Sequence, residues 1–101
     1  MSIEFAVSGN VIHVRLNGAF DFSSQDQLKA VTAQVLAEKS AMQVDVDLTK
    51  TAFVDSSTIR ALLTMRQSAL AAGKTLTLWN CTEKIREIFS VGGFDQIFEM
   101  R

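Results

Sequence analysis

Residues 53–63 read FVDSSTIRALL, in which two apolar residues lead into an acid and two serines, and then into a run with helical spacing. Asp and Ser are favoured at the start of a helix because their side-chain oxygens accept hydrogen bonds from the free amides of the first turn. Ile59, Leu62 and Leu63 follow at the spacing of one apolar helix face. The stretch therefore predicts a helix that is capped by Asp55 or Ser56.

The same stretch also admits a chemical interpretation. A hydroxyl at a helix N-terminus is well placed to carry phosphate, because the free amides and the helix dipole stabilise negative charge there. Local sequence alone does not separate a plain helix cap from such a site. Both interpretations stay open at this point.

Segments with the alternation of a β-strand flank this helix on both sides. They are residues 3–7, 11–16, 43–48 and 75–79, with a turn at Gly9-Asn10 between the first two and a short further candidate at 96–99. Two more helices are predicted, one after caps at residues 21–24 and ending near Lys39, the other after Thr82 and ending at Gly92-Gly93. The helix from Asp55 ends at Gly73.

This order predicts an α/β fold with a mixed sheet of four to five strands. Strands that are separated by helices pair in parallel through right-handed crossovers, whereas the opening hairpin is antiparallel. Polar residues occupy alternate strand positions, unlike the continuous apolar runs of a sheet that is covered on both sides. We therefore expect about three helices on one face of the sheet, with the other face left to solvent or to a partner.

Length and composition limit the protein class. The chain has 101 residues, of which 48% are hydrophobic and 21% charged, which fits one folded domain over residues 1–101. Its net charge of −1 gives no preference for nucleic acid or an anionic membrane, nor any reason to expect more than a monomer. No signal peptide or long apolar segment is recognisable, and the single cysteine suits a reducing compartment, so we expect a cytoplasmic protein without membrane insertion.

No group of residues forms a convincing active site. His13 is the only histidine and lies in mid-strand, with no cysteine or second histidine nearby in sequence to complete a metal site. Ser56 and Ser57 lack the G-x-S-x-G motif of a nucleophile, and no glycine-rich phosphate loop is present. Asp45 and Asp47 share a strand face but are better explained as solvated residues. We expect no catalytic activity, metal or cofactor.

Four segments, taken in order, resemble one family. They are L-N-G-A-F-D at 16–21, D-L-T-K-T-A-F-V-D-S-S-T-I at 47–59, A-G-K at 72–74 before a strand, and the helix end at 85–94. Together they resemble the STAS domain, which is named from sulfate transporters and bacterial anti-sigma factor antagonists. The resemblance spans nearly the whole chain and leaves little room for another domain.

The resemblance implies a binding module that works by partner switching. Stand-alone antagonists of this family bind, when unphosphorylated, an anti-sigma factor that is also a serine kinase with a histidine-kinase-like ATPase fold. The kinase phosphorylates the second serine of D-S-S-G, and a serine phosphatase of the PP2C type reverses the modification. In this chain the phosphorylation site implied is Ser57, with Ser56 and Thr58 as alternatives. The implied partner-binding residues are Asp21, Phe22, Ser23, Asp55, Ser56, Ser57, Thr58 and Arg60.

Two further residues bear on this hypothesis. Arg60 lies one helical turn after Ser57, near enough to pair with a phosphate and damp its charge. Thr58 stands where the family motif has glycine. Its larger β-branched side chain could crowd an incoming kinase loop, or its hydroxyl could be a neighbouring phosphate acceptor. The replacement is also consistent with a domain that is never phosphorylated. The resemblance also implies an alternative function, that of a non-phosphorylated STAS subunit that docks on the ATPase of a lipid ABC transporter.

Overall fold

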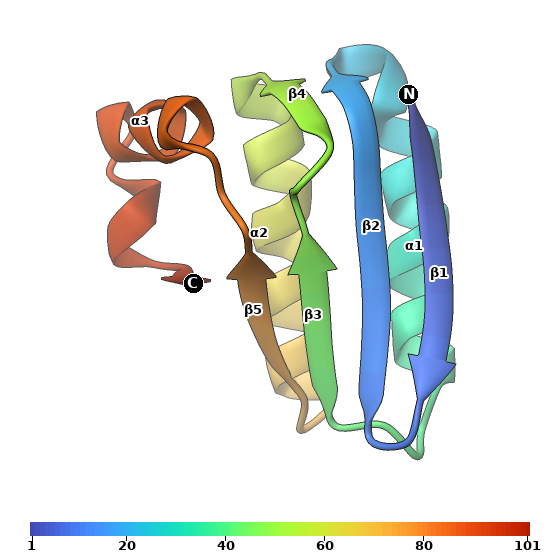
Figure 1. Cartoon of the computed structure of the whole chain (residues 1–101). Helices are drawn as coiled ribbons and strands as arrows, with labels where there is room; N and C mark the ends of the chain where they lie inside the picture. Colours follow the sequence, from blue (N-terminus) through green and yellow to red (C-terminus); the bar gives the residue numbers. More distant parts are fainter.

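The computed structural model describes residues 1–101, which form six strands and three helices (Figure 1). The strands are β1 (Ser2–Ser8), β2 (Val11–Phe20), β3 (Gln43–Asp47), β4 (Thr51–Val54), β5 (Thr75–Trp79) and β6 (Glu99–Met100). The helices are α1 (Gln25–Ala37), α2 (Ser56–Ala71) and α3 (Glu83–Val91), with short 3₁₀ turns η1 (Phe22–Ser24) and η2 (Phe94–Gln96). None of the helices combines the length and apolar character that crossing a membrane requires.

The strands form one mixed sheet in the order β1-β2-β3-β5-β6, with β4 also paired to β2. β1 and β2 are antiparallel, and all other pairs are parallel. Val14 of β2 lies opposite Val46 of β3, which in turn lies opposite Leu78 of β5, so the apolar positions of neighbouring strands share one face. The predicted mixed α/β sheet is confirmed.

β4 is a strand that the sequence pattern did not reveal, and it brings the sheet to six strands instead of four or five. It continues the line of β3 along β2, after a shift of register between Gly18 and Ala19. Gly18 has a φ of +96°, a conformation that L side chains rarely adopt. Only the two ends of β4 are buried, so it lacks the alternation by which strands are recognised. The last strand, β6, also begins later than the predicted segment at 96–99.

α1 and α2 lie side by side behind the sheet and cover one face, as expected (Figure 1). α3 lies instead beyond the C-terminal end of β5, at the level of β4 (Figure 1). The Phe89 ring of α3 meets Phe98 edge to face, with centroids 5.5 Å apart, which packs the C-terminal segment against this helix. The chain thus has a two-layer body, with its third helix placed at the end of the sheet where β2, β4 and β5 finish.

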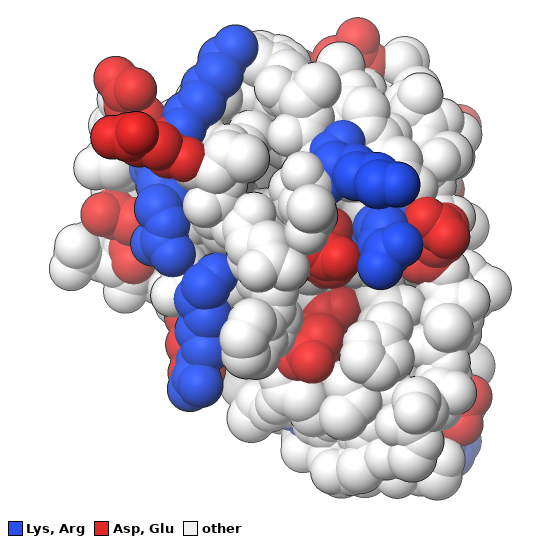
Figure 2. All heavy atoms as spheres, viewed as in Figure 1, with Lys and Arg blue, Asp and Glu red and all other residues white.

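The other face of the sheet is polar and open. Basic and acidic side chains lie next to each other there, without a large area of one sign (Figure 2). Arg15 donates to Asp47 at 3.2 Å and lies 3.9 Å from a carboxylate oxygen of Glu4, so one cation partly neutralises two carboxylates on the strands to either side. Such exposed pairs add little to stability, and the remaining single negative charge is too small to recognise a charged polymer.

Candidate partner-binding site at the start of α2

Asp55 is the residue that caps α2. Its backbone is extended, with φ −98° and ψ 179°, and one carboxylate oxygen, Oδ1, accepts hydrogen bonds from two groups. These are the Thr58 amide at 2.9 Å and the Ser57 hydroxyl at 2.7 Å. Of the two caps considered from sequence, the structure selects Asp55, and the same carboxylate fixes the orientation of the Ser57 hydroxyl.

The carboxylate of Asp55 is stabilised in its charged form. Partial burial acts to raise its pKa, but the hydrogen bonds from the Ser57 hydroxyl and the Thr58 amide outweigh burial and hold the pKa below its usual value. Asp55 is therefore a permanent hydrogen-bond acceptor for Ser57 at neutral pH.

Acidification is expected to weaken this cap. Because the pKa of Asp55 is lower in the folded chain than in the unfolded one, its contribution to stability is complete above about pH 4 and is lost as the pH falls through the folded pKa. We expect Asp55→Ala to lower the free energy of unfolding by about 1 kcal/mol at pH 7. Asp55→Asn should keep the cap, since Asn is an equally good N-cap residue, but lose this part of the pH dependence.

Urea unfolding of the wild type and both variants between pH 3 and pH 6 measures these effects. Asp47 also has a lowered pKa, so some acid sensitivity should remain in Asp55→Asn. Identical pH profiles for wild type and Asp55→Asn would show that the Asp55 charge does not contribute.

The segment 21–23, which contains three of the implied partner-binding residues, lies beside the start of α2. Phe20 pairs with Val54, and the Phe20 carbonyl accepts from the Asp55 amide at 3.2 Å, so the ends of β2 and β4 lead into neighbouring turns. The Gln25 side-chain amide, in the first turn of α1, donates to the Ser57 carbonyl at 3.1 Å. These bonds hold the two turns as one surface.

The same local arrangement occurs in both turns. The Asp21 carboxylate accepts from the Ser23 amide at 2.9 Å and the Ser23 hydroxyl at 2.5 Å, as the Asp55 carboxylate accepts from Ser57. Within the first of these turns Phe22, which lies between Asp21 and Ser23 in the sequence, is 74% exposed, which is unusual for so large an apolar group. Two Asp-x-Ser turns with an exposed aromatic ring form a suitable contact surface for another protein.

Thr58 lies outside this surface. Its side chain is completely buried below the first turn of α2, whereas Ser56 is exposed and Ser57 is half-buried. The prediction of Thr58 as a partner contact or alternative phosphate acceptor is therefore wrong, because no incoming molecule can reach its hydroxyl. Nor does it crowd a kinase loop, since the extra atoms relative to glycine fill core space.

Arg60 is exposed and forms no ion pair within the chain. Its guanidinium is thus free to pair with an acidic group that the folded chain itself does not supply. The remaining predicted site residues, Asp21, Phe22, Ser23, Asp55, Ser56 and Ser57, all lie in the two neighbouring turns.

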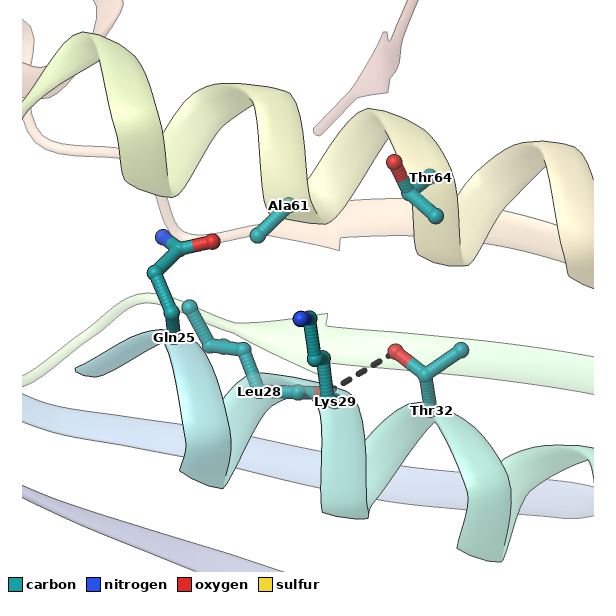
Figure 3. Close-up of a pocket in the computed structure, with 6 residues that line it drawn as sticks. All are labelled: Gln25, Leu28, Lys29, Thr32, Ala61 and Thr64. Carbon is teal, nitrogen blue, oxygen red and sulfur yellow. Dashed lines mark hydrogen bonds between the residues drawn. The ribbon is translucent and has the colours of Figure 1, made fainter. Parts of the chain in front are cut away.

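A shallow hollow between α1 and α2 extends this surface. It has a volume of about 150 Å³ and is lined by Gln25, Leu28, Lys29, Thr32, Ala61 and Thr64. Leu28 points from α1 toward Ala61 of α2, and Gln25 and Lys29 lie to either side of it (Figure 3). Pockets for small molecules usually measure about 300–1,000 Å³, so this one suits a single inserted side chain. Gln25 links it to Ser57, a role that no sequence signal indicated.

The other chemistry-bearing residues do not converge. His13 is exposed on the open sheet face opposite Asp45, and no three His, Cys, Asp or Glu residues lie together as a metal site would require. Burial raises the pKa of the half-buried Cys81 thiol, which makes it less reactive. Asp47 accepts from Arg15, Thr49 and Asn80, which gives it a structural role at the strand ends.

Residues 3–100 match the family model described as "Mlab, STAS domain". The chain belongs to the STAS domain family. The STAS-domain containing protein PA14_20770 of Pseudomonas aeruginosa (strain UCBPP-PA14) is 25% identical over 95 residues, which make up 94% of this chain and 92% of that protein. This STAS domain is therefore similar in extent, as well as in sequence, to a known member.

Solved structures show the same STAS fold. An anti-sigma factor antagonist from Mycobacterium paratuberculosis is 17% identical with a TM-score of 0.85, and the match covers 98% of this chain and 83% of that one. The Bacillus cell fate determinant SpoIIAA in its phosphorylated form is 18% identical with a TM-score of 0.74, over 99% and 91% of the two chains. At these identities the likeness establishes the fold, and the structural neighbours include anti-sigma factor antagonists.

Proposed function

We propose that this STAS domain is an anti-sigma factor antagonist of a bacterial partner-switching pathway, acting in the cytoplasm. Unphosphorylated, it binds an anti-sigma factor that is also a serine kinase with a histidine-kinase-like ATPase fold, and phosphorylation of Ser57 releases it. The observation that carries this proposal is the Ser57 hydroxyl, held at 2.7 Å by the Asp55 carboxylate beside the exposed Phe22 turn. The likeness to SpoIIAA, which is known in a phosphorylated form, supports it.

The chain's own part in this cycle is binding, not catalysis. The partner kinase supplies ATP and the transfer machinery, and a PP2C-type serine phosphatase removes the phosphate. Asp55 acts on the acceptor by orienting its hydroxyl, since the charged carboxylate accepts the hydroxyl proton in a hydrogen bond. Asp21, Phe22, Ser23, Ser56 and Arg60 supply the surrounding contacts.

A second candidate is a STAS subunit that is never phosphorylated and docks on the ATPase of a lipid ABC transporter. Two observations favour it. The matching family model is described by the name Mlab and not as an anti-sigma factor antagonist. Thr58 also replaces the glycine of the D-S-S-G motif and is buried in the core. In this candidate the same two turns serve as a constitutive contact surface.

Phosphorylation assays separate the two candidates. We expect a kinase-like ATPase from the same genome, with ATP and magnesium, to add a single phosphate detected by intact mass spectrometry. The phosphate should be absent from Ser57→Ala and retained in Ser56→Ala, which removes the neighbouring exposed hydroxyl as a matched control. No phosphate with any candidate kinase, together with stable copurification with a transporter ATPase, would support the second candidate instead.

A further inference from the structure

β1 forms an open edge of the sheet. Its only strand partner is β2, with which it pairs from Ser2 to Ser8 without a shift of register. No strand lies on its other side, at the right-hand edge in Figure 1. No hydrogen bond from another segment reaches its main chain, so every second amide and carbonyl of β1 points outward unpaired.

This edge lacks the features that usually prevent pairing between chains. Exposed edge strands are commonly protected by lysine, proline, a bulge or an outward charge. β1 reads SIEFAVS and contains none of these except Glu4. The Glu4 carboxylate is turned toward its own sheet, where it accepts from Asn17 at 2.8 Å and lies 3.9 Å from Arg15.

The sequence of β1 is complementary to itself when read antiparallel about Phe5. In that register Phe5 faces its own copy, Ile3 faces Val7 of the second chain, and Glu4 faces Ala6. Apolar residues therefore meet apolar residues on the helix side, and the two Glu4 carboxylates are never opposite each other. Val7 is 40% exposed in the single chain, which leaves apolar surface at this edge to be covered.

The adjoining side of α1 is compatible with a second copy. A hollow between β1 and α1 is lined by Met1, Ser2, Ile3, Gln27, Ala30 and Val31, none of which carries a charged side chain. Gln27, Ala30 and Gln34 follow one side of α1 and are exposed. An antiparallel pairing of β1 strands would place the two α1 helices on the same side of the joined sheet, with small or uncharged residues toward the junction.

We propose that β1 is a self-association surface, where two copies of the chain pair antiparallel about Phe5 and join their sheets into one. Neither composition nor net charge indicated a dimer, because the signal lies in an edge that only the fold leaves unpaired. A second copy is favoured over an unrelated strand because the complementarity is with β1 itself. This surface lies along β1, away from the turn that contains Ser57. The proposal of self-association therefore does not depend on the proposed function.

Cysteine cross-linking tests the register. In a Cys81→Ser background, Glu4→Cys and Ala6→Cys both place a thiol on the exposed side of β1. Directly opposite residues have Cα atoms about 4.5–5.5 Å apart, within disulfide range, whereas diagonal neighbours at about 7–8 Å fall outside it. We expect a disulfide-linked dimer when the two variants are mixed and oxidised, and little from either alone. Equal cross-linking of all combinations, or none, would overturn the proposal.

Light scattering of the unmodified chain provides a second measurement. Its mass should rise with concentration from 11.1 kDa toward twice that value. Val7→Lys, which adds a charge at the edge, should raise the dissociation constant about tenfold or more. Val91→Lys is the matched control, since Val91 is 86% exposed in α3, and should leave dimerisation unchanged. A strictly monomeric wild type, or a Val7→Lys variant that associates as well as wild type, would refute it.

Discussion

Phosphorylation of Ser57 is expected to weaken binding of the domain to its partner ATPase by about 100-fold. The phosphate adds roughly −1.5 to −2 charges at one point of the contact surface. It also replaces the hydroxyl proton that Ser57 shares with Asp55, so that a favourable 2.7 Å hydrogen bond becomes a contact between two anions. Repulsion and desolvation of this kind cost several kcal/mol in an interface, and about 1.4 kcal/mol corresponds to tenfold in affinity.

This change does not require the domain to refold. The free amides of the first turn of α2 and the exposed Arg60 can stabilise the phosphate on the domain itself. The cost in free energy therefore appears in the binding of the partner and not in the stability of the domain. Calorimetric titration of the partner with purified phosphorylated and unphosphorylated protein measures it directly.

Three variants sharpen this measurement. Ser57→Asp should weaken binding only partly, because it supplies one charge and fewer oxygens than phosphate. Ser40→Asp adds the same charge at an exposed position between α1 and β3, away from the Ser57 turns, and should have no effect. Arg60→Ala should make the phosphorylated form bind still more weakly. Phosphoprotein that binds as tightly as unmodified protein would contradict the switch, and an Arg60→Ala phosphoprotein no weaker than phosphorylated wild type would contradict the role of Arg60.

Lys74→Ala is expected to lower the free energy of unfolding by about 3 kcal/mol. Lys74 is only 2% exposed, and its ammonium group donates to the carbonyls of Glu38 and Ala41, both at 2.5 Å. These carbonyls belong to the segment that leaves α1, where no helical partner is available. Without the ammonium group, acceptors in a largely buried site lose a charged donor, at a cost of about 1–3 kcal/mol for each unsatisfied group.

Chemical denaturation of two variants and a control separates packing from hydrogen bonding. Lys74→Met retains most of the buried chain and should lose about 2 kcal/mol through the missing hydrogen bonds alone. Lys39→Ala, at an exposed lysine near the same turn, should change stability by less than about 0.5 kcal/mol. If Lys74→Ala lowered the free energy of unfolding as little as Lys39→Ala, the hydrogen bonds to the carbonyls of Glu38 and Ala41 would not contribute to stability, because water would replace the ammonium group there.

The buried role of Lys74 could not be predicted from the sequence. The Ala72-Gly73-Lys74 turn was one of the segments that resemble the STAS family, but the resemblance assigned no task to the lysine. A lysine directly after a helix is normally exposed. Only the packing of the α2–β5 turn against the end of α1 places its ammonium group between two carbonyls that are more than 30 residues away in sequence.

The candidate site likewise combines features that the sequence predicts with features that only the fold determines. A helix cap at Asp55 or Ser56, and the helix after it, follow from local chemistry, because an N-cap and its first turn involve only three or four consecutive residues. The contrast between exposed Ser56 and buried Thr58 does not follow. Both are small hydroxyl residues, and which of them faces the core depends on how α2 rests on the sheet.

The sequence by itself therefore determined the mixed α/β sheet, the family and a helix cap at Asp55 or Ser56, since periodicity, glycine turns and capping act over short distances along the chain. The tertiary structure decided the remaining features: β4, the contact of Gln25 with Ser57, the burial of Thr58 and Lys74, and the unpaired edge of β1. Each of these features depends on which segments, distant in sequence, become neighbours in the fold. The side-chain pattern of a single segment does not indicate which segment will pack against it.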